Sequence, residues 1–198
     1  MEHERTSTGL PTPKVAMWVF LASECMLFGG LISTYLLYRG RSTTGPYPDE
    51  IFDIPYTSVS AFVLLASSLT MVLALAAIQR GHLHRFRVWI LTTGLLGSVF
   101  VGGQIYEFTT FFREGLTING NLFGSTFYTL TGFHGAHVTV GILMLFTLFW
   151  LSYRGTIGQH NSLPVEVIGL YWHFVDIVWI IIFTVIYLIP DAPRTIAP

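Results

Sequence analysis

The sequence predicts an all-α integral membrane protein, a single domain of residues 1–198 built as a bundle of five transmembrane helices. Of its residues 52% are hydrophobic and only 11% are charged, whereas a soluble domain usually carries about 25% charged residues. The apolar residues form five continuous runs, each long enough for the roughly 20 helical residues that a bilayer crossing needs. Helices are preferred to strands because a lone chain in lipid must satisfy its own backbone hydrogen bonds.

The predicted spans are separated by loops that contain Gly, Pro, Asn and charged residues. A polar tail, residues 1–14, precedes the first span, and Pro190 ends the last one. The fourth run is longer than a perpendicular crossing requires, so we expect that helix to be tilted. The spans are predicted at residues 15–38, 57–78, 88–108, 125–151 and 167–189.

Positive charge in the short loops predicts the orientation, because cytoplasmic loops carry an excess of Lys and Arg. The acidic residues Asp49, Glu50 and Asp53 fall on the side opposite the N-terminal tail. We therefore expect the N-terminus inside and the C-terminus outside. The side of the tail carries Arg5, Lys14, Arg80, Arg85, Arg87 and Arg154, and the other side carries Arg39, Arg41, Arg113 and Arg194.

Several function classes receive no support from the sequence. The formal net charge of -1 gives no indication of a nucleic-acid partner. Cys25 is the single cysteine, so neither an internal disulfide nor a cysteine cluster can form. There is also no Gly-rich phosphate loop, nucleophile elbow or HExxH pattern. Soluble-type catalysis is therefore not expected.

Six ionisable residues fall inside the predicted spans, where charge is costly and each such residue is a functional candidate. At about 1.5 Å of rise per residue, Glu24 and Asp176 lie near mid-depth. Glu107 lies at the outer end of its span, where water can help to solvate it. The full set is Glu24, Glu107, His134, His137, His173 and Asp176.

Four interpretations of this set stay open. A haem clamp needs imidazoles on different helices, but His134 and His137 are three residues apart and share one helix face. A metal site built from these two histidines and a carboxylate is chemically feasible. The polar groups can also line a proton or ion pathway, or form hydrogen bonds between helices that lock the bundle. We favour the locking role.

The fifth span carries two further patterns. His173 and Asp176 are three residues apart, so we expect a hydrogen bond or ion pair within the helix. Trp172 and Trp179 are seven apart and form one stripe, which is more typical of packing or of a lipid-facing anchor than of a cofactor site. The glycines that flank His134 at 132 and 135 are expected to let another backbone approach closely. This favours tight packing there over a cofactor cavity.

Four segments resemble subunit III of haem-copper terminal oxidases. "STFYTLTGFHGAHVTVG" at 125–141 and "YWHFVDIVWIIIFTVIYLI" at 171–189 carry paired FHGxHV and WHFVDxVW motifs. "WVFLASECMLFGG" at 18–30 and "GGQIYEF" at 102–108 carry glutamates at the positions where that family has them. The resemblance extends over about residues 14–189 and is to the five-span bacterial form.

The resemblance implies a non-catalytic subunit of a proton-pumping, oxygen-reducing oxidase of aerobic respiration, in the bacterial plasma membrane. It implies no catalytic, metal or cofactor-binding residue in this chain, because haem and copper lie in subunits I and II. Subunit I would be the main contact, with subunit II and small subunits beside it, and the chain would support proton uptake and stability. Glu24 falls on the family's intramembrane glutamate, and the other five ionisable residues fall on polar positions of the motifs.

The resemblance also implies contacts with lipid. The family binds phospholipid in a cleft, one wall of which is formed by two helices that the five-span form lacks, so that another chain would have to supply this wall. From its charge alone, we also expect the basic loop with Arg80, Arg85 and Arg87 to face the cytoplasm and to meet anionic lipid or subunit I. Trp172 and Trp179 are further candidate contacts of lipid or subunit I. The electron donor stays open: cytochrome c in an aa3-type oxidase is favoured, and a quinol is the alternative. A free-standing transporter or membrane haem protein is the remaining alternative.

Overall fold

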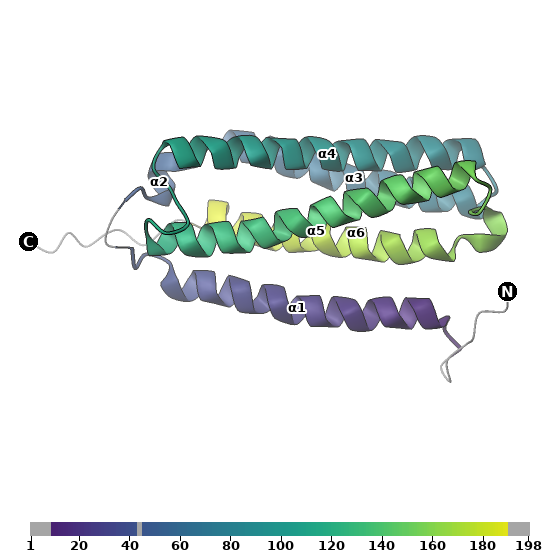
Figure 1. The fold of residues 1–198 in the computed structure, drawn as a ribbon, viewed down its shortest axis with the longest axis horizontal. Coiled ribbons are helices and arrows are strands. Elements are labelled where there is room, and N and C mark those ends of the chain that lie inside the picture. The colour runs from purple at the N-terminus through teal and green to yellow at the C-terminus, as the bar shows by residue number, and fades with distance from the viewer. Residues whose placement is uncertain (1–8, 43–44, 190–198) are drawn as a thin grey trace, which may run out of the picture.

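The computed structural model describes residues 9–42 and 45–189, and its long elements are five apolar helices, each long enough to cross a membrane (Figure 1). The predicted all-α architecture of five such helices is therefore confirmed. The long helices are α1 (Thr12–Tyr38), α3 (Ile54–Gln79), α4 (Leu83–Arg113), α5 (Leu122–Tyr153) and α6 (Leu163–Phe183), the last continued by a π-helical turn over Thr184–Leu188. A short helix α2 (Pro48–Ile51) and a 3₁₀ turn (Gln159–Asn161) lie in the connections.

Helix α4 is five residues longer at each end than the span predicted at 88–108. Its first turn is formed by part of the basic segment 80–87, whose composition is typical of a loop between spans. Polar residues at the ends of a membrane helix can extend towards the headgroups and water while the backbone stays helical. An apolar run therefore marks the part of the helix inside the hydrocarbon, and the helix itself continues beyond it.

The starts of α3 and α5 have clear local causes. The backbone N–H of Tyr56 donates to the Asp53 carboxylate at 3.1 Å, and the N–H of Gly124 donates to the Asn121 side chain at 2.6 Å. Side-chain oxygens at this position satisfy backbone donors that the first helical turn leaves free. Between α3 and α4 the chain turns at Gly81, whose φ of +77° favours glycine.

Helices α3 to α6 form a four-helix bundle, and α1 packs alongside it against α5 and α6 (Figure 1). Successive long helices run in opposite directions, so that α1 begins at one end of the bundle and α6 ends at the other. Helix α1 buries one narrow stripe, formed by Leu21, Phe28 and Tyr35 at seven-residue spacing. Most of its remaining surface is exposed, so α1 is the peripheral helix of this chain.

The tryptophan stripe of α6 lies inside the bundle. Trp172 and Trp179 are both 1% exposed, which agrees with the packing interpretation of the stripe and not with a lipid-facing anchor or a contact with lipid or subunit I. The ring of Trp172 fills the space beside two glycines: a Cβ would lie 2.6 Å from it at Gly97 and 2.8 Å from it at Gly141. Its Nε1 donates to Ser67 Oγ at 3.1 Å.

The expected close approach beside His134 is found elsewhere. A Cβ at Gly132 would meet nothing within 4 Å, and one at Gly135 would meet the side chain of Gln104 rather than a backbone. Gly97 of α4 and Gly141 of α5 instead leave room for the Trp172 ring of α6, which lies against both.

Candidate functional site

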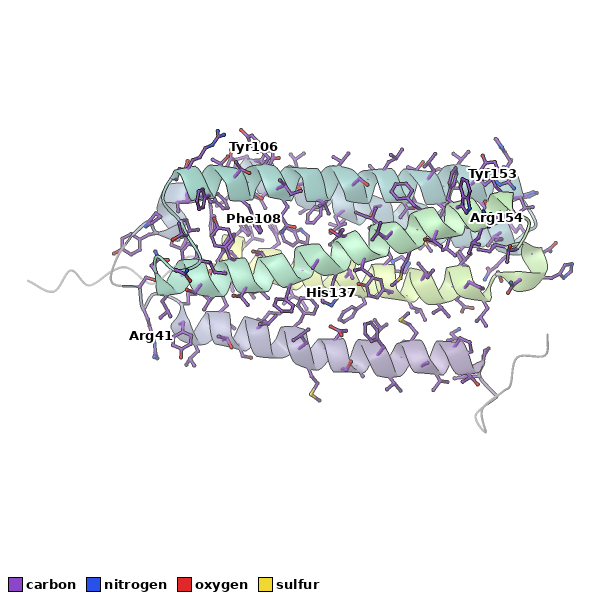
Figure 2. The ribbon with its side chains drawn as sticks, in the orientation of Figure 1. Arg41, Tyr106, Phe108, His137, Tyr153 and Arg154 are labelled. Carbon is purple, nitrogen blue, oxygen red and sulfur yellow. The ribbon has the colours of Figure 1, made fainter. Side chains whose placement is uncertain are left out.

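His134 and His137 both lie on α5 but face different helices. His134 is fully buried, its Nε2 lies 3.2 Å from the Val175 carbonyl oxygen on α6, and its ring stacks on Trp179 with centroids 5.0 Å apart. His137 Nε2 lies 3.1 Å from Glu24 Oε2 on α1. Figure 2 shows His137 about midway along the bundle. The two imidazoles thus make separate contacts with α6 and with α1.

His137 and Glu24 form a polar contact between α5 and α1. His137 Nδ1 lies 2.7 Å from the Phe133 carbonyl oxygen and must therefore carry a hydrogen, since a carbonyl only accepts. On the other side Nε2 meets the Glu24 carboxyl group at 3.1 Å. Both side chains are mostly buried, with exposed fractions of 18% for His137 and 13% for Glu24. The pair is a strong polar contact between α1 and α5.

His173 and Asp176 meet a hydroxyl group of α3. His173 Nδ1 lies 2.6 Å from Ser68 Oγ, and the same hydroxyl interacts with the Asp176 carboxyl group. The contacts found among the described residues therefore join α6 to α3 instead of forming the expected direct pair within α6. Ser68 of α3 thus lies against both side chains.

Glu107 joins α4 to α3 near one end of the bundle. Its carboxyl group accepts a hydrogen bond from the Thr57 hydroxyl, and only 6% of the residue is exposed. It borders an open cleft of about 540 Å³ that is also lined by Asp53, Tyr56 and Glu114. The structure thus places Glu107 beside an opening at the end of its helix.

Metal ligation is not supported by the arrangement of these groups. Within residues 9–42 and 45–189, no three His, Cys, Asp or Glu side chains lie together in a way that could hold a metal ion. What the arrangement can do is join helices: α1 to α5, α5 to α6, α6 to α3 and α3 to α4.

Two further polar contacts of α1 were not found by sequence reasoning. Lys14, in the first turn of α1, forms an ion pair with Glu166, in the first turn of α6. Arg39, just after α1, donates to the carbonyl oxygens of Val185, at 3.1 Å, and of Ile189. These partners are about 150 positions apart in the chain. The sequence held one signal for the first contact. Lys14 and Glu166 directly precede two predicted spans that start on the same side of the membrane, so their side chains could meet there.

Gln104 is another buried polar residue that the sequence did not single out. It is 5% exposed, and its side-chain oxygen lies against Gly135, next to His134. The signal was its place in "GGQIYEF", three residues before Glu107. It adds a polar group of α4 to the interface with α5.

The basic segment 80–87 divides into exposed and internal parts. Arg80 and Arg85 are exposed. Arg87 instead donates to Ser152 Oγ at 3.1 Å and to the Ser152 carbonyl oxygen at 2.6 Å, and its guanidinium lies 4.1 Å from the centre of the Tyr153 ring. Arg87 therefore joins the start of α4 to the end of α5.

Comparison with known proteins identifies the relatives of this chain. The family model described as cytochrome c oxidase subunit III matches residues 3–190. The chain is 38% identical over 174 residues to a cytochrome c oxidase subunit 3 of Bacillus sp. (strain PS3), covering 88% of this chain and 84% of that protein. It is 39% identical over 175 residues to a quinol oxidase subunit 3 of Bacillus subtilis (strain 168), covering 88% and 85%. A cytochrome bo(3) ubiquinol oxidase subunit 3 of Pseudomonas aeruginosa is 38% identical over 172 residues, covering 86% and 82%.

Proposed function

Since this chain belongs to the cytochrome c oxidase subunit III family, we propose that it is the non-catalytic subunit III of a proton-pumping haem-copper oxidase that takes electrons from cytochrome c. Membership makes it a subunit of a terminal oxidase complex. One observation supports the non-catalytic role. The ionisable groups inside the spans contact neighbouring helices, and in the described part of the chain they do not converge on a metal site.

In this proposal the chain supports subunit I. Subunit I is its main contact, with subunit II and small subunits nearby, and those partners hold the haem and copper. Glu24, Glu107, His134, His137, His173 and Asp176 fix the helices that pack beside subunit I, so that proton uptake and the stability of the complex are maintained. The chain lies in a bacterial plasma membrane with its N-terminus inside, and phospholipid binds in a cleft completed by another chain.

A quinol is the second candidate donor, because quinol oxidase subunits match this chain as well as cytochrome c oxidase subunits do. At 38 to 39% identity, the similar proteins are divided between cytochrome c oxidases and quinol oxidases. The polar contacts within this chain are compatible with either donor, because the donor would bind to other subunits.

Purification of the intact complex through a tag on this chain tests the proposal. We expect the chain to comigrate with a haem-bearing subunit and the complex to oxidise reduced cytochrome c faster than a quinol. The reverse preference would establish the second candidate. The chain purified alone should contain no stoichiometric haem, copper or iron. Stoichiometric metal or haem in that sample would contradict the non-catalytic role and favour a free-standing haem protein.

A further inference from the structure

The two ends of the bundle differ strongly in charge. Among the described residues at the end that carries the α3–α4 turn and the α5–α6 loop, the only acidic side chain is Glu166, which is paired with Lys14. The opposite end carries Asp53, Glu107 and Glu114 around one cleft. The exposed basic and imidazole groups of the first end are Arg80, His82, His84, Arg85, Arg154 and His160, which we call the basic end surface.

Two connections that are far apart in the sequence form this surface together. Gln159 Nε2 donates to the Gln79 carbonyl oxygen at 3.4 Å, and a Cβ at Gly81 would lie 2.9 Å from Gln159 Oε1. Arg87 adds its hydrogen bonds to Ser152 at the end of α5. The α3–α4 turn is therefore fixed against the α5–α6 loop, and the charges of both belong to one surface.

Exposed aromatic rings mark the depth of the basic end surface. Trp150 and Tyr153 are 60% and 62% exposed at the end of α5. Guanidinium groups lie over them, Arg154 at 5.5 Å from the Trp150 ring and Arg87 at 4.1 Å from the Tyr153 ring. Figure 2 shows Tyr153 and Arg154 at this end of the bundle, opposite Arg41. Trp and Tyr rings are enriched at the headgroup level of a membrane, so these rings place the neighbouring charges at the depth of lipid phosphates.

We propose that the basic end surface binds the phosphate groups of anionic phospholipids. Arginine guanidinium groups match phosphate oxygens with two parallel hydrogen bonds, and the imidazoles of His82, His84 and His160 add further donors. A basic segment next to a membrane helix is attracted to anionic headgroups. The arginines come from two connections, so a lipid bound here also joins the α3–α4 turn to the α5–α6 loop. This ligand assignment is independent of the electron donor proposed above.

The test measures lipid retention by the intact oxidase complex. The double variant Arg80→Gln/Arg85→Gln is compared with Arg41→Gln/Arg113→Gln, which removes the same charge at the opposite end. Each complex is saturated with phosphatidylglycerol or phosphatidylcholine, and the lipids retained are counted by native mass spectrometry. We expect the first variant to reduce phosphatidylglycerol affinity on the order of thirtyfold, since it removes two arginines and each arginine near an anionic surface contributes about 1 kcal/mol. The control should match the wild type, and phosphatidylcholine retention should not change.

Several results would overturn the proposal. Equal retention of phosphatidylglycerol by the wild type and by Arg80→Gln/Arg85→Gln is one. A second is the loss of another subunit from that variant, which would make the surface a protein interface. A third is displacement of phosphatidylglycerol by the same concentration of free inorganic phosphate, which would show that the surface binds phosphate and not lipid. Arg80→Lys/Arg85→Lys keeps the charge and should retain the lipid. If the Gln variant does not assemble, the wild type at raised salt gives the same test, because screening should release phosphatidylglycerol selectively. Haem content and oxygen reduction, measured in parallel, report on the proposed function separately.

Discussion

Helix α1 and the bundle of α3 to α6 are held in place by different kinds of contact. Only 11% of the residues in the apolar stretch of α1 are buried, against 44% in α3 and in α6. Helix α1 is joined to its neighbours by polar contacts near its start, its middle and its end, at Lys14, Glu24 and Arg39. The bundle instead encloses large rings beside glycines, with Trp172 as its centre. Lipid offers no hydrophobic driving force between helices, so packing and polar contacts have to hold them together. We therefore expect close packing to contribute most of the stability in the bundle, and polar contacts to contribute most of the attachment of α1.

The largest expected effect is at the packing of Trp172. Gly97→Ala places a Cβ 2.6 Å from the indole ring, and overpacking of this kind costs about 1–3 kcal/mol. Gly29→Ala on α1 is the matched control, because a Cβ there would meet nothing within 4 Å and alanine favours the helix by up to about 1 kcal/mol. Denaturant unfolding of the protein in micelles should therefore show a loss for Gly97→Ala and no loss for Gly29→Ala.

A double-mutant cycle checks the cause of this loss. The close atoms at Gly97 belong to the six-membered ring of the indole, which Trp172→Phe removes. The combined variant Gly97→Ala/Trp172→Phe should therefore be more stable than the sum of the two single effects predicts. Additive effects would mean that the clash with Trp172 is not the cause.

An intermediate effect is expected at the mid-depth contact of α1. Glu24→Leu leaves His137 Nε2 without its partner, and polar contacts between membrane helices contribute about 0.6–1.7 kcal/mol. Glu24→Gln keeps a hydrogen-bonding side chain there and should cost less. In the assembled complex Glu24→Gln should retain substantial oxygen reduction and proton pumping, because the proposed role of Glu24 is to hold α1 in place. Measured protons pumped per electron decide this: complete loss of pumping in an assembled Glu24→Gln complex would make Glu24 a required proton carrier.

Sequence reasoning found the five helices and the polar groups inside them but not their partners. Residues three apart on a helix differ by about 60° around its axis, so His134 and His137 share one broad face. Two neighbouring helices pack against that face, and each takes one histidine. Likewise, the spacing of Trp172 and Trp179 defines a stripe on one side of the helix. The sequence cannot show whether that stripe faces the protein core or the lipid, because both surroundings are apolar. The contact of Lys14 with Glu166 depends on how the first and fifth spans pack, which no local pattern encodes.

The smallest expected effect is at the start of α1, where Lys14 pairs with Glu166. The two side chains are 25% and 32% exposed, so water and salt screen the pair, and such pairs contribute about 0.2–1 kcal/mol. Lys14→Ala should lower the stability in micelles by no more than this, and less at high salt. The charge-swapped variant Lys14→Glu/Glu166→Lys should regain most of the loss, whereas Lys14→Glu alone should not. If Lys14→Ala lowered the stability as much as Gly97→Ala does, α1 would be held mainly by the ion pair at its start and not by the contact between Glu24 and His137. The difference between α1 and the bundle would then lie in charge pairing at the helix ends.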